Sequence, residues 1–167
     1  MNAVVSFAPL SRSDATVLIL GSMPGVASLN AQQYYAHPRN HFWPIMASLA
    51  GVDLAAPHGQ RVDALTQSGF AVWDVLQSCV RPGSLDSAIQ PGTRVPNDFA
   101  AFFNAHLEIR LVGFNGTEAE KSFKAHVLPD LQTAAALRYV RLPSTSPAHA
   151  IGFENKLAAW RSALGRQ

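Results

Sequence analysis

The sequence predicts a three-layer α/β/α sandwich, because short apolar segments typical of strands alternate along the chain with segments of helical periodicity. The chain has 167 residues, of which 48% are hydrophobic and 14% charged. This length suits one core, so we expect residues 1–167 to form a single domain. The apolar content also argues against intrinsic disorder.

Four short apolar segments are predicted to be strands. The first (TVLIL) and the third (IRLVGF) are almost continuously apolar, which is typical of parallel strands that are covered on both faces. The predicted strands are residues 16–20, 70–75, 109–114 and 137–142.

The segments between and after these strands have helical spacing of apolar residues. Residues 44–50 begin at a proline, and residues 60–68 end before a glycine, both common at helix termini. Asn97 is expected to cap a phenylalanine-rich helix, and Thr117 with Glu120 forms a capping-box pattern. The last helix is expected to bury an apolar stripe, formed by Phe153, Leu157, Trp160 and Leu164.

Three long stretches show neither the spacing of a helix nor that of a strand and are expected to be loops: residues 21–40, 77–96 and 143–152. Loops of this length in a compact domain usually carry function. The first and third follow strands directly, at the edge where open α/β sheets bind ligands. We therefore look for the chemistry in these two loops.

Composition limits the classes of protein that the chain can belong to. No apolar run approaches the roughly 18 residues of a membrane span, and the N-terminus lacks the order of a signal peptide, so we expect a cytoplasmic protein. The single cysteine, Cys79, excludes a disulfide framework and a multi-cysteine metal site. The net charge of +2 permits a nucleic-acid partner without demonstrating one.

The segment GSMPG, residues 21–25, comes directly after the first predicted strand. Its glycines and proline predict a tight turn that brings backbone N–H groups close to a phosphate or a water molecule. A tight turn with no ligand fits the same residues. A Walker phosphate loop is excluded, because no Gly-Lys-Ser/Thr follows.

The segment YYAHPRNHFW, residues 34–43, is dense in aromatic rings, imidazoles and amides. Such groups stack on, and hydrogen-bond to, a planar base. Phe42 and Trp43 also suit a core, since large aromatic residues are mostly buried. The histidines, His37 and His41, have no third ligand nearby, so we expect no metal site.

Two more segments follow later strands. Asn115, in FNGT, offers one acceptor and two donors to the edge of a base, or forms an Asn-Gly turn. The segment LPSTSPAHA, residues 142–150, is stiffened by two prolines and presents small hydroxyl groups that approach a phosphodiester closely. A plain Ser/Pro loop that binds no ligand is the alternative interpretation of this segment. Asp86, in GSLDSAI, either caps a turn through its carboxylate or faces the cleft.

These four segments, in this order, resemble the uracil-DNA glycosylase superfamily, and most closely its hypoxanthine-DNA glycosylase (DNA-deoxyinosine glycosylase) branch. In that branch a GS-x-P loop, PRN-x-FW and S-x-SPA recur, and WDVLQSC with GSLDSAI adds to the match. The resemblance covers residues 17–160. It implies a central four-stranded parallel sheet and an enzyme that flips a deaminated base, most of all hypoxanthine, out of DNA and hydrolyses its N-glycosidic bond.

The resemblance also implies roles for single residues. The third position of the first loop, often an Asp or Asn that orients the attacking water, is Met23 here, and a thioether cannot do this. The branch implies Asn40, in PRN, for that duty, with Ser22 as a second catalytic candidate. Residues implied to bind the base are Gly21, Met23, Phe42 (by stacking) and Asn115. Residues implied to bind DNA are Arg39, Ser144, Thr145, Ser146 and His149.

Several alternatives stay open from the sequence. One is a uracil or mismatch glycosylase of the same fold, and another is a non-catalytic nucleotide-binding or single-strand-binding module that stacks bases on Tyr34, Tyr35 and Phe42. A phosphate-ester hydrolase is excluded by the lack of a carboxylate cluster for metals in these segments. None of the three lysines lies in the four segments, so we expect a monofunctional glycosylase with no Schiff-base step. We also expect the enzyme to need no cofactor and to be a monomer.

Overall fold

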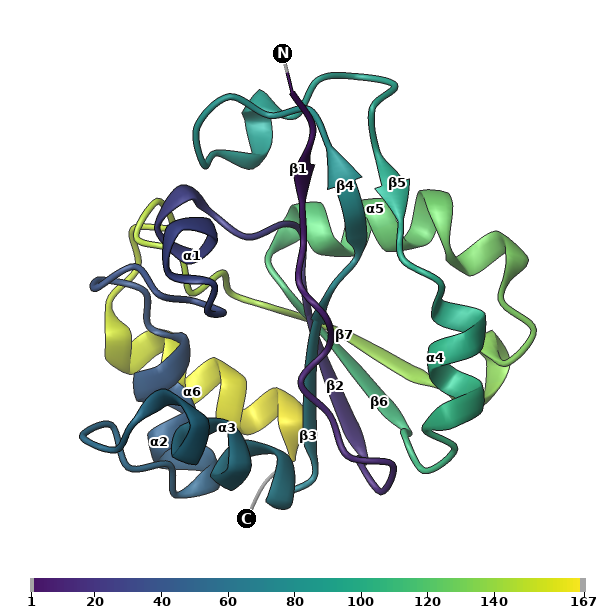
Figure 1. The fold of residues 1–167 in the computed structure, drawn as a ribbon. Coiled ribbons are helices and arrows are strands. Elements are labelled where there is room, and N and C mark those ends of the chain that lie inside the picture. The colour runs from purple at the N-terminus through teal and green to yellow at the C-terminus, as the bar shows by residue number, and fades with distance from the viewer. Residues whose placement is uncertain (1, 166–167) are drawn as a thin grey trace.

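A four-stranded parallel sheet forms the centre of the structure, a computed structural model that describes residues 2–165 (Figure 1). Its strand order is β3-β2-β6-β7, and every neighbouring pair is parallel. The four predicted strands are confirmed, with bounds that shift by at most two residues. The strands are β2 (Val17–Gly21), β3 (Phe70–Asp74), β6 (Leu111–Asn115) and β7 (Arg138–Leu142).

Helices cover both faces of this sheet, which confirms the predicted three layers (Figure 1). One face carries α2 (Phe42–Ala50), α3 (His58–Gln67) and α6 (Phe153–Leu164). The other face carries α4 (Phe99–Ala105) and α5 (Thr117–His126). No helix among residues 2–165 is both long and apolar enough to span a membrane.

The predicted helix caps are wrong in detail. Asp98, not Asn97, caps α4, because its carboxylate accepts the Ala101 N–H at 3.1 Å. The Asn97 side chain instead donates to the carbonyl oxygen of Asp74 at 2.8 Å and so fixes the end of β3. The capping box at Thr117 does not form, since the residue that caps α5 is Gly116, whose φ of +98° suits glycine.

Two of the three expected loops contain short elements. Within residues 21–40 the helix α1 (Val26–Ala31) forms, followed by non-helical backbone up to α2. In place of a loop at 77–96, the strands β4 (Leu76–Cys79) and β5 (Val95–Pro96) pair with β1 (Val4–Val5) in a small antiparallel sheet, ordered β1-β4-β5. Elements of two to six residues are too short to show periodicity. Three single-turn 3₁₀ helices complete the fold: Asp86–Ala88, Leu128–Asp130 and Ala134–Ala136.

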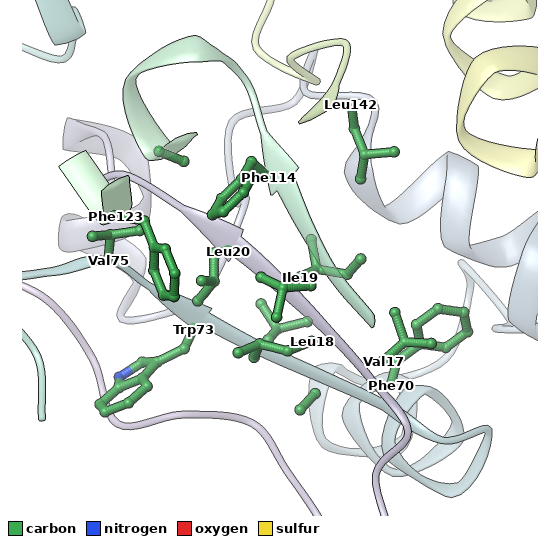
Figure 2. Packing of buried hydrophobic residues seen from close by; sticks show 14 of the residues in the cluster. Val17, Leu18, Ile19, Leu20, Phe70, Trp73, Val75, Phe114, Phe123 and Leu142 are labelled. Atoms are coloured by element: carbon green, nitrogen blue, oxygen red, sulfur yellow. The ribbon is translucent and has the colours of Figure 1, made fainter. Parts of the chain in front are cut away.

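The core lies between the central sheet and its two helical layers. Leu18, Ile19 and Leu20 of β2 are fully buried, as expected for the second strand of a covered parallel sheet. Figure 2 shows Phe123 of α5 near Phe114 of β6, and their ring centroids are 5.3 Å apart. This packing fixes the carboxyl ends of the strands, where Asp74 lies in register with Gly21.

Candidate active site

A cavity of about 660 Å³ opens at the carboxyl ends of the central strands, where the sequence predicts the chemistry. Most predicted site residues line it. From the catalytic and base-binding sets these are Gly21, Ser22, Met23, Asn40 and Asn115. From the DNA-binding set these are Ser144, Thr145, Ser146 and His149. Arg39 is exposed outside the cavity, so its DNA contact stays a prediction.

The floor of the cavity is built around Gly21, the last residue of β2. A Cβ atom at this position would lie 2.5 Å from Asp74 Oδ1 and 2.9 Å from the Tyr35 hydroxyl oxygen. Only a glycine therefore leaves room above this strand for both the carboxyl of Asp74 and the hydroxyl of Tyr35. Asp74 Oδ2 and the Tyr35 hydroxyl are both buried and have no hydrogen-bond partner among the described residues.

Unpaired buried polar atoms cost free energy, and here both belong to residues that line one cavity. Burial and the nearby Asp86 raise the pKa of Asp74 to about 7, so its neutral form is well populated near neutral pH. Burial, together with Asp74, also raises the pKa of Tyr35, which keeps its hydroxyl protonated. The floor thus presents neutral hydrogen-bonding groups to a ligand.

The cavity is lined by the tyrosines Tyr34 and Tyr35 and not by Phe42. Phe42 has no exposed surface and lies under Tyr35, with ring centroids 4.2 Å apart and planes at 22°. The prediction that Phe42 stacks on a base is therefore wrong, because a ring buried as part of α2 cannot reach a ligand. The backbone of Tyr35 has a φ of +54°, an uncommon conformation for a non-glycine residue and one that recurs at functional sites.

The loop after β2 is held by a segment that follows β4. Ser22 Oγ donates to Asp86 Oδ1 at 2.6 Å, so Asp86 faces the cavity and does not cap a turn. The Arg81 guanidinium, itself buried, donates to the carbonyl oxygens of Met23 and Pro24 at 3.5 and 2.6 Å. This role of Arg81 cannot be predicted from the sequence, since a lone arginine is normally exposed.

Asn40 lies at the cavity wall, just before α2. Its Oδ1 accepts the Phe42 N–H at 2.9 Å, and its Nδ2 has no partner among residues 2–165. One lone pair of Oδ1 and both Nδ2 hydrogens thus remain for a water molecule or substrate. The neighbouring His41 does not line the cavity: its ring packs on Phe153, and burial lowers the pKa of its imidazole.

The loop at 143–152 is held by its own hydrogen bonds and by Asn115. Asn115 Nδ2 donates to Thr145 Oγ1 at 3.0 Å, and Asn115 Oδ1 accepts the Thr145 N–H at 2.9 Å. Thr145 is only 1% exposed, so the prediction that it contacts DNA is wrong: its side chain joins the loop to β6. Asn115 keeps one Nδ2 hydrogen, on which its predicted base-reading role now depends.

Comparison with known proteins identifies the family. A sequence model of the uracil DNA glycosylase superfamily matches residues 8–164. This chain belongs to that superfamily. Its curated relatives include proteins named hypoxanthine DNA glycosylase from Methanosarcina barkeri (30% identity, covering 96% of this chain and 97% of the relative) and Methanosarcina acetivorans (31%, covering 87% and 88%).

A solution NMR structure from Methanosarcina acetivorans, described as a uracil DNA glycosylase, has the same fold. Its TM-score is 0.80 at 27% identity, covering 96% of each chain. The protein is therefore a monofunctional DNA glycosylase, which acts on DNA and hydrolyses an N-glycosyl bond.

Two lysines of this glycosylase lie closer to the cavity than the sequence predicts. Lys121 of α5 lines it, although it falls outside all four sequence segments. Lys156 of α6 is fully buried, and its Nζ donates to the Ser146 carbonyl oxygen at 3.1 Å. Burial lowers the pKa of Lys156, but its hydrogen bond directs the amine to the back of the loop. Among residues 2–165 no three His, Cys, Asp or Glu side chains are grouped to hold a metal ion.

Proposed function

We propose that this DNA glycosylase removes hypoxanthine from DNA and leaves an intact abasic site. The observation that carries the proposal is the cavity floor, which Tyr35 lines and where the Tyr35 hydroxyl and the carboxyl of Asp74 both lie over Gly21. A ring for stacking and polar atoms without partners are what a flipped base requires. The names of the two curated relatives support hypoxanthine as the base.

The proposed reaction needs little chemical apparatus. The flipped base stacks on Tyr35, and the sugar is held at the mouth of the cavity, near the loop at 143–152. A water molecule positioned by Asn40 adds to C1′ as the base departs from an oxocarbenium-like sugar. Asn40 is neutral and a weak base, so it acts by positioning the water rather than by deprotonating it.

The chemistry of Met23 favours Asn40 as the residue that positions the water. Its side chain is 7% exposed and lines the cavity, but a thioether neither donates a hydrogen bond nor accepts one strongly. Ser22, the other catalytic candidate, already donates its hydroxyl hydrogen to Asp86. In our proposal Ser22 therefore holds Asp86 in place, and its oxygen lone pairs are what it can offer to a water molecule.

The test is excision from oligonucleotides that carry hypoxanthine, uracil or xanthine at one position, followed by alkali to cleave abasic sites. We expect hypoxanthine to be removed fastest, from a strand that stays intact until alkali is added. Faster removal of uracil would assign the protein to the uracil-specific alternative. Borohydride added during turnover is expected to trap no protein–DNA adduct, even with Lys121 at the cavity wall.

We also propose that the enzyme works as a cytoplasmic monomer and that Ser144, Ser146, His149 and Arg39 contact the DNA backbone. The first three border the cavity mouth, where the strand that carries the flipped nucleotide must pass. Light scattering of the free protein tests the monomer, and a dimer mass would contradict it.

A further inference from the structure

Asp74 is a buried carboxyl at the base-binding floor that the water-positioning mechanism does not use. It ends β3, is 3% exposed and borders the cavity. Its Oδ2 has no hydrogen-bond partner among the described residues, and its Oδ1 lies over Gly21. A carboxylate without donors in such a place is poorly stabilised, whereas a neutral carboxyl is tolerated and carries a hydrogen.

The charged and titratable groups around Asp74 favour the neutral form. The negative charge of Asp86, which lines the same cavity, raises the pKa of Asp74, and the raised pKa values of Tyr34 and Tyr35 keep both phenols protonated. Among the described residues, Arg81 is the charge that lowers the pKa of Asp74, and its guanidinium donates to backbone carbonyl oxygens rather than to Asp74.

We propose that Asp74 is the proton donor to the departing base, a role that rests on the proposed function. As the C1′–N bond breaks, its electron pair stays with the base, and the carboxyl proton of Asp74 moves to an oxygen or nitrogen of that base. The water that Asn40 positions adds its oxygen to C1′ and releases one proton to solvent. Solvent then returns a proton to Asp74, so the net reaction is hydrolysis.

This role complements the positioning of water, because the two act on opposite sides of the breaking bond. A neutral departing base is a far better leaving group than an anionic one, and a positioned acid typically contributes about a hundredfold or more to rate. The two aspartates of the cavity then differ in function: Asp74 is kept neutral by burial, and Asp86 is held by the hydroxyl of Ser22.

The first test is single-turnover excision between pH 5.5 and 9 by the wild type, Asp74→Asn and a matched control, Asp63→Asn. Asp63 is an exposed carboxylate on α3, on the helical layer away from the floor. We expect the wild-type rate to fall about tenfold per pH unit above pH 7, where Asp74 ionises. Asp74→Asn should be about a hundredfold slower at pH 6 and flat over the same range, because an amide has no proton to give.

Two results would overturn the role. One is an alkaline limb that persists in Asp74→Asn, and the other is an Asp74→Asn rate close to that of the wild type at pH 6. Either leaves the proposed function intact, since excision by the wild type measures that function on its own. Asp63→Asn should follow the wild type at every pH.

Thermal unfolding gives a second readout that does not depend on activity. Burial raises the folded-state pKa of Asp74 to about 7 from its ordinary value of 3.8, so the folded state binds the extra proton between these pH values. Its contribution to stability is full below about pH 4 and is lost as pH rises through 7. We expect the Tm of the wild type to fall relative to that of Asp74→Asn across this range. Parallel curves would mean that Asp74 is ionised throughout, and would overturn the proposal.

Discussion

The polar groups on the floor of the cavity, around Gly21, differ in their hydrogen bonding from those on the wall that Asn115 and the loop at 143–152 form. On the floor, the Tyr35 hydroxyl and Asp74 Oδ2 are buried and have no hydrogen-bond partner within residues 2–165. On the wall, Thr145 is paired with Asn115, the Ser144 and Ser146 hydroxyls accept backbone N–H groups, and Lys156 holds the Ser146 carbonyl. The floor leaves hydrogen-bonding capacity for a ligand, whereas the wall uses its capacity to hold a shape.

This difference separates residues that bind from residues that position. A group whose hydrogen bonds are all internal contributes to function through the geometry it maintains, and its loss should affect every substrate alike. A group with unused capacity contributes by direct contact, so its loss should depend on the ligand. The substitutions below test this distinction, from the largest expected effect to the smallest.

Asn40→Ala should have the largest effect, because Asn40 retains unpaired amide hydrogens at the cavity wall. We expect single-turnover excision to fall by about a hundredfold or more, the scale of a residue that orients a reactant, with little change in DNA affinity. Asn104→Ala, an exposed asparagine on α4, is the matched control. Wild-type rates in Asn40→Ala would remove Asn40 from the mechanism and return attention to Ser22.

Tyr35→Ala should come next. The stacking surface for the base is lost, and stacking contributes about 1–3 kcal/mol, so kcat/KM should fall roughly tenfold to a hundredfold. Tyr35→Phe keeps the ring and removes the buried unpaired hydroxyl, so it should retain most activity and unfold at an equal or higher Tm. If Tyr35→Phe lost as much activity as Tyr35→Ala, the hydroxyl rather than the ring would be the binding group.

Asn115→Ala tests the wall. Loss of both bonds to Thr145 should lower the free energy of unfolding by about 1–3 kcal/mol, measured by urea denaturation. Excision of hypoxanthine, uracil and xanthine should slow by one common factor. A change in the ranking of these bases would instead support the predicted base-reading role and place Asn115 with the floor.

Ser146→Ala should have the smallest effect. Its hydroxyl accepts the Ala148 N–H at 3.1 Å on the exposed part of the loop, so a single backbone-facing bond is lost. We expect affinity to fall about twofold to fivefold, equally for damaged and undamaged duplex, in a fluorescence-anisotropy titration. Ser13→Ala changes an exposed serine that does not line the cavity and serves as the control. An effect confined to damaged DNA would contradict a backbone contact.

The fold can be predicted from the sequence where one physical signal dominates. Continuous apolar segments predict the four central strands, and their carboxyl ends predict where the cavity opens. The sequence does not predict which of two similar residues reaches the cavity. Phe42 and Tyr35 are both aromatic and seven residues apart, and only the packing of α2 shows which ring is covered.

The arrangement of residues on the cavity floor could not be predicted from the sequence for a related reason. Asp74 sits in an apolar strand as a single acidic residue, and its partners, Gly21 and Tyr35, come from segments that the chain brings together only in the folded state. The place of Lys121 could not be predicted because the FNGT segment ends at Thr117, at the start of α5. Only the structure shows that the side of α5 that carries Lys121 lines the cavity.

The bonds that hold the loop after β2 also set the order in which the protein acquires its parts. Arg81, Ser84 and Asp86 tie down Met23, Pro24, Val26 and Ser22, and each of these bonds joins residues 57 to 64 positions apart. Closing a connection of that length costs entropy that only an existing sheet can offset. We therefore expect the loop at residues 21–25 to be organised after the sheet in folding and released before it in unfolding. Its amides should exchange with deuterium well before those of β2 and β6, so activity is lost on warming while the sheet is still intact.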